Sequence, residues 1–103
     1  MMSERRAAKP KRLVRDIRIL NEFGLHARPA SQLAKLAAKY RADIMIHKGS
    51  DQVNAKSILG IITLAAAPDT MLRFVAMGPD ADEALAAIAA LVESRFGEAD
   101  DGG

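Results

Sequence analysis

The sequence predicts an α+β domain of two layers, in which helices pack on one face of an antiparallel sheet. Three observations lead to this fold class. Strand-like and helix-like segments follow one another in the order β-α-β-β-α-β-α. A hairpin-type turn, Gly49-Ser50-Asp51, separates the second and third strands. The chain has 103 residues, half of them apolar, which suits one domain with a modest core.

The first strand is predicted over residues 13–20, with Leu13, Ile17 and Ile19 on one face. After a turn, a helix is predicted over residues 27–39. Its apolar positions repeat at the spacing of one buried helix face: Ala30, Leu33, Ala34, Ala37 and Ala38. Because these side chains are small, the helix is expected to lie close to the sheet.

The middle of the chain contains the other three strands and a short helix. Residues 43–48, 52–55 and 71–77 are predicted as the second, third and fourth strands. The short helix is predicted over residues 58–64, and Ser57 has the residue type and position of its N-cap. This order alternates sheet and helix segments in the way that a two-layer domain requires.

The last helix is predicted to begin with a capping box, in which Asp80 and Glu83 satisfy backbone N–H groups of the first turn. Gly97 is the predicted stop at its C-terminal end. The apolar positions of this helix also share one face: Ala84, Leu85, Ile88, Leu91 and Val92. The helix is therefore expected to cover the sheet beside the first one.

The charge of the chain is concentrated at its ends. Residues 1–12 contain five basic side chains and one acidic one, whereas residues 98–103 are acidic and the part between them is nearly neutral. We interpret residues 1–12 as a solvated, disordered arm, residues 13–97 as the folded domain and residues 98–103 as an acidic tail. The isoelectric point of about 9.2 therefore reflects the arm. With 4% aromatic residues the chain offers few platforms for base stacking, which disfavours binding to nucleic acid.

Composition excludes several other kinds of site. The chain has no cysteine, which excludes disulfides, thiolate catalysis and Cys-ligated metals. The two histidines, His26 and His47, stand far apart without matched carboxylates, so neither a metal site nor a cofactor is predicted. No apolar run approaches membrane-spanning length, and no signal-peptide core follows the basic N-terminus. We expect a cytoplasmic protein without membrane insertion.

His26 is the most informative residue of the chain. It lies in Gly24-Leu25-His26-Ala27-Arg28-Pro29-Ala30, a pattern that places an imidazole at or just before a helix N-terminus. Free backbone N–H groups and the helix dipole favour an anion there. A neutral imidazole presents a lone pair that attacks phosphorus without a separate base. Ala27 and Arg28 form the helix start that would hold the phosphate, and the Arg28 guanidinium would bind its oxygens. The alternative is that His26 only caps the helix or packs against it.

Two segments resemble the HPr family, the histidine-containing phosphocarriers of the bacterial phosphotransferase system. The segment around His26 resembles the active-site signature, and residues 54–64 resemble the regulatory serine segment. The resemblance extends over residues 13–96, and residues 83–91 look most like the nitrogen-related branch. It implies an open-faced β-sandwich, with a four-stranded antiparallel sheet and three helices on one face. This family fold agrees with the order of elements derived above.

The resemblance also implies a function. The chain would be a phosphoryl carrier that acts with partner enzymes and is not itself an enzyme. His26 would accept the phosphoryl group on Nδ1 from phosphorylated Enzyme I, with Arg28 as the active-site arginine, and an Enzyme IIA-type acceptor would receive it. Ser57 would be a target of an ATP-dependent HPr kinase/phosphorylase, or else an ordinary N-cap. In the nitrogen-related branch, the output would be regulation through binding and not sugar transport.

The short helix contains more apolar residues than one buried face needs. We predict that Ile58, Leu59 and Ile62 form an apolar docking patch beside His26 for transient partners. Ile61 and Leu64 are expected to pack in the core. The alternative is that all five residues are ordinary core positions.

A few further residues have expected positions. Phe23 stands where many family members have a small polar residue near the active centre, which is expected to change partner preference. His47, Lys48, Lys56 and Arg73 are expected on the solvated surface. None of these four is assigned a chemical role.

Overall fold

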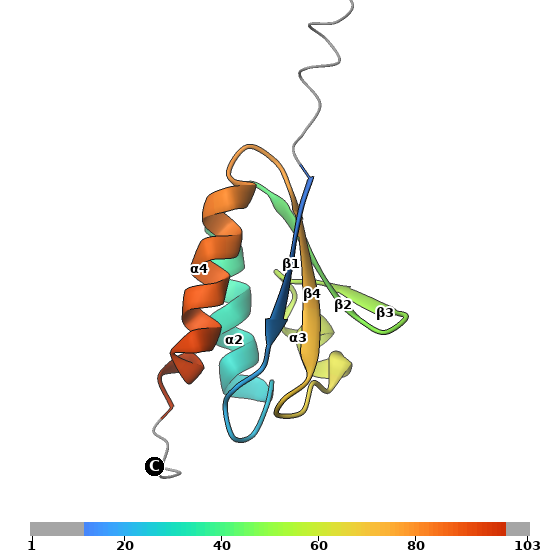
Figure 1. Cartoon of the computed structure of the whole chain (residues 1–103), viewed down its shortest axis with the longest axis vertical. Helices are drawn as coiled ribbons and strands as arrows, with labels where there is room; N and C mark the ends of the chain where they lie inside the picture. The colour runs from blue at the N-terminus through green and yellow to red at the C-terminus, as the bar shows by residue number, and fades with distance from the viewer. Residues whose placement is uncertain (1–11, 99–103) are drawn as a thin grey trace, which may run out of the picture.

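The computed structural model describes residues 12–98, which form a four-stranded antiparallel sheet with helices packed against it (Figure 1). The elements in chain order are β1 (Arg12–Arg18), α2 (Ala27–Ala37), β2 (Asp43–Lys48), β3 (Asp51–Asn54), α3 (Ile58–Leu64), β4 (Met71–Met77), α4 (Ala81–Glu93) and the 3-10 helix η1 (Arg95–Gly97). The predicted order of strands and helices is confirmed. Residues 1–11 of the proposed arm and residues 99–103 of the proposed tail lie outside the described residues.

The strands lie in the order β1-β4-β2-β3, and every neighbouring pair is antiparallel. In Figure 1, α2 and α4 lie together on one face of the sheet, and α3 packs against α2 and β3. The opposite face is polar in part. There, Arg73 of β4 donates to Asp16 of β1 with a 2.8 Å Nε–Oδ1 distance, and both side chains are exposed. Within residues 12–98, no helix is long and apolar enough to cross a membrane.

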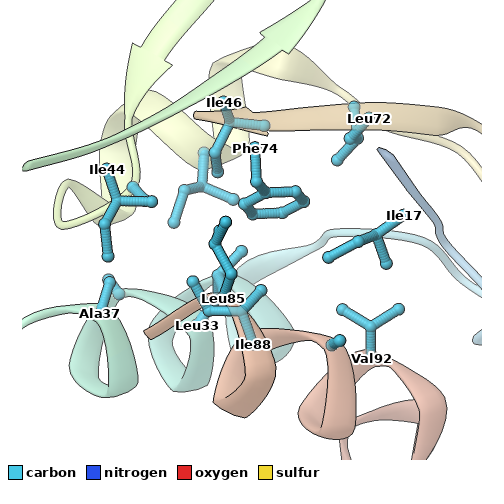
Figure 2. Close-up of a cluster of buried hydrophobic side chains, with 14 of the residues drawn as sticks. Ile17, Leu33, Ala37, Ile44, Ile46, Leu72, Phe74, Leu85, Ile88 and Val92 are labelled. Atoms are coloured by element: carbon cyan, nitrogen blue, oxygen red, sulfur yellow. The ribbon is translucent and has the colours of Figure 1, made fainter. Parts of the chain in front are cut away.

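The core fills the space between the sheet and the two long helices. Figure 2 shows Phe74 of β4 in the middle of this cluster, facing apolar side chains of both helices. The cluster includes Ile17, Ile44, Ile46 and Leu72 from the strands and Leu33, Ala37, Leu85, Ile88 and Val92 from the helices. The predicted apolar faces are therefore confirmed, with one correction. Ala38 is exposed because α2 ends at Ala37, so the chain has already left the helix at that position.

Asp80 does not form the predicted capping box. Its side chain makes no bond to the first turn of α4; instead, its carboxylate accepts from the backbone N–H groups of Arg41 and Ala42, both at 2.8 Å. The prediction was wrong because the loop before β2 presents two unpaired donors, which sequence-local reasoning does not include. The bond from Arg41 N–H, followed by that from Ala42, holds the pKa of the Asp80 carboxyl below its ordinary value of 3.8. Asp80 thus ties α4 to β2.

We expect this contact to make stability depend on acid pH. Because folding lowers the pKa of Asp80, its ionised form stabilises the fold above the ordinary carboxyl pKa. That contribution is lost as pH falls through the lower folded-state value. Urea unfolding of an Asp80→Asn variant should therefore show a smaller loss of unfolding free energy below about pH 5 than the wild-type protein. Identical pH dependences in the two proteins would contradict this role.

Two lysines that were expected on the solvated surface are half-buried and donate to backbone carbonyls. Lys48 Nζ donates to the Leu64 carbonyl at 2.8 Å, and Lys56 Nζ donates to the Tyr40 carbonyl at 2.8 Å. Each lysine therefore satisfies a carbonyl at or just beyond the C-terminal end of a helix, where backbone acceptors have no helical donor. The expectation of a solvated position was wrong for both lysines, because their side chains come from other parts of the chain and donate to carbonyls near these helix ends.

Candidate functional site

His26 is the N-cap of α2 and follows the turn that leaves β1. Its backbone is extended (φ −87°, ψ −167°), and its carbonyl accepts from Ala30 N–H at 2.9 Å. Its side chain makes no capping bond and is 45% exposed. The helix begins at Ala27, as the sequence predicts. The alternative that the imidazole only caps the helix is therefore wrong, and the ring is accessible at a helix N-terminus.

The loop before His26 is fixed by close backbone packing. Gly24 has φ +69°, and a Cβ at this position would collide with the Ala66 carbonyl oxygen. The next residue, Leu25, donates its N–H to that same oxygen at 2.9 Å. Glycine is thus required both for the left-handed backbone and for the close approach. Because Ala66 lies just after α3, this contact joins the His26 loop to the end of α3.

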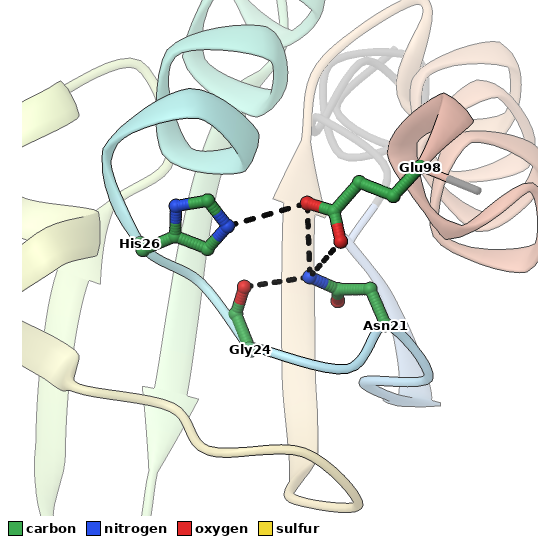
Figure 3. Close-up of polar contacts among 4 residues, drawn as sticks. All are labelled: Asn21, Gly24, His26 and Glu98. Carbon is green, nitrogen blue, oxygen red and sulfur yellow. Dashed lines mark hydrogen bonds and ion pairs between the residues drawn. The ribbon is translucent and has the colours of Figure 1, made fainter. Parts of the chain in front are cut away.

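A polar network lies on one side of the imidazole (Figure 3). His26 Nε2 lies 3.3 Å from Glu98 Oε2. Asn21 is fully buried, and its Nδ2 donates to the Gly24 carbonyl at 2.7 Å and lies 3.4 Å from both Glu98 oxygens. Figure 3 shows Nδ1 on the opposite side of the ring from Glu98, and Nδ1 has no hydrogen-bond partner in residues 12–98.

Glu98 is the site residue that sequence reasoning missed. The sequence assigns it to an acidic tail, whereas the structure places its carboxylate beside His26 and leaves it only 17% exposed. The two residues are 72 positions apart, and no motif links them. Asn21 was also treated only as part of a turn. Its burial and its bonds make it the support of both the loop and the carboxylate.

Phe23 and Arg28 border the other accessible parts of the site. Phe23 is 63% exposed, and its ring meets that of His26 edge-on, with centroids 6.2 Å apart and planes at 85°. Arg28 is exposed, and its guanidinium has no ion pair within the described part of the chain. The first turn of α2, which begins at Ala27, contains no acidic residue. No acidic residue of this turn opposes an anion at the helix start, and the nearby Glu98 carboxylate lies on the Nε2 side of the ring.

Ser57 and the short helix agree with their predicted local structure. Ser57 is the N-cap of α3, and its Oγ accepts from Gly60 N–H at 3.0 Å. The predicted division of the apolar side chains into exposed and buried sets is also seen. Ile58, Leu59 and Ile62 are exposed, Leu59 by 74%, whereas Ile61 and Leu64 are buried.

Comparison with known proteins decides the family. The family model for the phosphorylation site of the PTS HPr component matches residues 13–94. The chain belongs to the HPr family. It is 41% identical over 86 residues to the phosphocarrier protein HPr of Cupriavidus necator, covering 84% of this chain and 97% of that protein. It is 42% identical over 88 residues to the phosphocarrier protein NPr of Shewanella violacea, covering 85% and 97%.

Comparison with solved structures indicates the same family. The crystal structure of HPr-C-His from Thermoanaerobacter tengcongensis superimposes with a TM-score of 0.81 at 40% identity, covering 84% of this chain and 98% of that one. The open-faced β-sandwich expected from the resemblance is thus confirmed. With its HPr and NPr relatives, the chain is a phosphocarrier of the phosphotransferase system.

Proposed function

We propose that His26 is the phosphorylated residue of this carrier. It accepts the phosphoryl group on Nδ1 from phosphorylated Enzyme I in the cytoplasm and passes it to an Enzyme IIA-type acceptor. One observation carries the proposal: an exposed imidazole at the start of α2 has Nε2 beside a carboxylate and Nδ1 without a partner. Family membership supports the same assignment.

The geometry suggests how transfer proceeds. The Nδ1 lone pair attacks phosphorus, the new N–P bond forms, and the bond to Enzyme I breaks with its electron pair remaining on Enzyme I. By analogy with other phosphorylated side chains, the group adds about −1.5 to −2 charges near neutral pH. The N–H groups at the start of α2 and the exposed Arg28 guanidinium are suited to bind that charge. Onward transfer repeats the same exchange, with the acceptor as nucleophile.

Direct phosphorylation tests this function. The purified protein is incubated with cognate Enzyme I and phosphoenolpyruvate, and the expected product is a single phosphoryl adduct that is acid-labile and base-stable. Adding an Enzyme IIA-type acceptor should remove the adduct from the chain. Failure to form it with an Enzyme I that phosphorylates its own known carrier would overturn the proposal.

The apolar docking patch of Ile58, Leu59 and Ile62 is proposed to contact these partners. A Leu59→Glu variant should fold normally because this side chain is largely exposed. It should transfer phosphate at least about 10-fold more slowly, since a charge would be buried without a partner in the complex. The measurement is kcat/KM for phosphorylation by Enzyme I. Val14→Glu, which changes an exposed residue of the open sheet face, is the matched control and should retain the wild-type rate.

Ser57 is proposed as a regulatory site for HPr kinase/phosphorylase. We expect Ser57→Asp to lower the rate of phosphorylation by Enzyme I about 10-fold, because negative charge beside the docking patch opposes binding. Aspartate is itself a good N-cap, so α3 should remain folded. Ser57→Ala loses the cap, at a cost of about 1 kcal/mol, without adding charge. Equal transfer rates for Ser57→Asp and Ser57→Ala would contradict a regulatory effect of charge.

Similarity to the Shewanella NPr favours a second output for the same chemistry. In this alternative, phosphorylation of His26 controls binding to regulatory partners of nitrogen metabolism. Supplying the phosphorylated protein with sugar-type and nitrogen-type IIA acceptors in parallel distinguishes the two outputs. The acceptor that is phosphorylated faster identifies the branch.

A further inference from the structure

We propose that Glu98 is a positioning residue for His26, and this inference rests on the proposed function of that histidine. The Glu98 carboxylate holds the imidazole at Nε2, so that the Nδ1 lone pair is available to the incoming phosphorus. The contact is 3.3 Å long, and the carboxylate is much less exposed than the ring that it meets. Glu98 thus acts through His26 and is not a nucleophile or a phosphate ligand.

The backbone after α4 brings Glu98 to this place. Arg95, Phe96 and Gly97 have φ angles of +56°, +57° and +75°, so three residues in succession adopt left-handed conformations. Side chains other than glycine rarely adopt this conformation unless packing enforces it, and such residues concentrate at functional sites. The Phe96 side chain supplies that packing, because it is 3% exposed and belongs to the hydrophobic core. The turn therefore leads the chain from the end of α4, around a fixed anchor, to the loop before α2, where Glu98 meets His26 (Figure 3).

The side-chain amide of Asn21 is a second donor beside the Glu98 carboxylate. Asn21 Nδ2 lies 3.4 Å from each Glu98 oxygen while it donates to the Gly24 carbonyl. Asn21 Oδ1 is buried without a partner in the described residues, so the amide is oriented by the acceptors around its nitrogen. Glu98 is therefore held between a buried amide and the imidazole. The same amide also supports the turn that leads to His26.

This arrangement has a defined chemical consequence. A carboxylate accepts a hydrogen bond only from a protonated nitrogen, so it favours the neutral tautomer with hydrogen on Nε2 and the lone pair on Nδ1. A carboxylate orients a catalytic imidazole in the same way in the Ser-His-Asp triad. When Nδ1 bonds to phosphorus, the proton on Nε2 remains beside the carboxylate. The distance is longer than that of a strong charge-assisted bond, so we expect an effect on transfer of about 3- to 10-fold.

The test combines a ring measurement with a transfer rate, using ¹⁵N-labelled full-length protein in mildly alkaline buffer. Wild type should show Nε2 protonated, Nδ1 unprotonated and an Nε2–H signal that exchanges slowly with water. Glu98→Ala should lose the slow exchange and accept phosphate from Enzyme I about 3- to 10-fold more slowly. Glu98→Gln keeps an acceptor oxygen, so it should restore part of the slow Nε2–H exchange and part of the transfer rate. Glu93→Ala, an exposed acidic residue at the end of α4, is the matched control and should match wild type.

The positioning role is overturned if Glu98→Ala leaves either the ring signals or the transfer rate unchanged. A rate loss with normal ring signals would indicate a structural effect of the turn, and a thermal melt of each variant checks that the fold is retained. If the wild-type protein accepts no phosphate, the proposed function fails on its own. The ring signals are recorded without any donor, and they still decide whether Glu98 sets the tautomer.

Discussion

A His26→Ala variant is expected to keep its fold and to lose phosphoryl transfer completely. The imidazole is 45% exposed and makes no capping bond, so its removal leaves α2 and the core unchanged. Without the imidazole, the helix start can still bind an anion, but the site has no nucleophile. Arg28 and Phe23 do not replace the imidazole, since neither side chain offers a nucleophilic lone pair. Glu98 is held beside Asn21 on the Nε2 side of the ring.

The measurement is the amount of phosphoryl adduct formed after incubation with Enzyme I and phosphoenolpyruvate. The control is His47→Ala, which removes the other histidine from β2, on the strand side of the molecule. His47→Ala should be phosphorylated as fully as wild type. An adduct on His26→Ala, or its loss from His47→Ala, would assign the chemistry to a different residue.

Phe74→Ala is expected to cause the largest loss of stability among single core substitutions. Phe74 lies on β4, one of the two inner strands, and its side chain is completely buried among residues of β2, α2 and α4. Truncation removes apolar contacts and leaves a cavity that the rigid sheet cannot close, which costs about 3–5 kcal/mol. For a domain of this size, that loss lowers Tm by more than about 10 °C.

Thermal and urea unfolding measure this change. Phe23→Ala makes the same chemical substitution at a side chain that is 63% exposed, so it is the matched control. Its effect should stay within about 0.5 kcal/mol of wild type. Similar losses for the two variants would contradict the placement of Phe74 at the centre of the core.

The fold followed from local patterns because most segments bury one face. Alternation over residues 13–20 and helical spacing over residues 27–39 each place apolar side chains on the side that meets the core, and the structure uses those sides. Asp80 shows where this reasoning ends. Its spacing to Glu83 satisfies a local capping rule, but two donors from the loop before β2 compete successfully for its carboxylate. Such competition depends on tertiary contacts and has no local pattern.

The residues of the site also fall into two groups, those that a local motif identifies and those that only tertiary contacts bring to the site. His26, Arg28 and Ser57 lie in short motifs next to helix starts, so the local sequence is enough to find them. Glu98 reaches His26 only through the buried Phe96 and the left-handed turn around it. The sequence contains those residues, but nothing in their spacing shows that the turn brings Glu98 to His26. An aromatic residue followed by glycine, Phe96-Gly97, was the one feature of the sequence that indicated a packed turn after the last helix.

The nitrogen that binds the phosphorus is the decisive property of this site. After phosphorylation by Enzyme I and phosphoenolpyruvate, ³¹P–¹⁵N couplings in the labelled protein identify the nitrogen that is bonded to phosphorus. We expect a single adduct on His26, with phosphorus on Nδ1 and the proton on Nε2 beside Glu98. Phosphorus on Nε2, or on any residue other than His26, would contradict it.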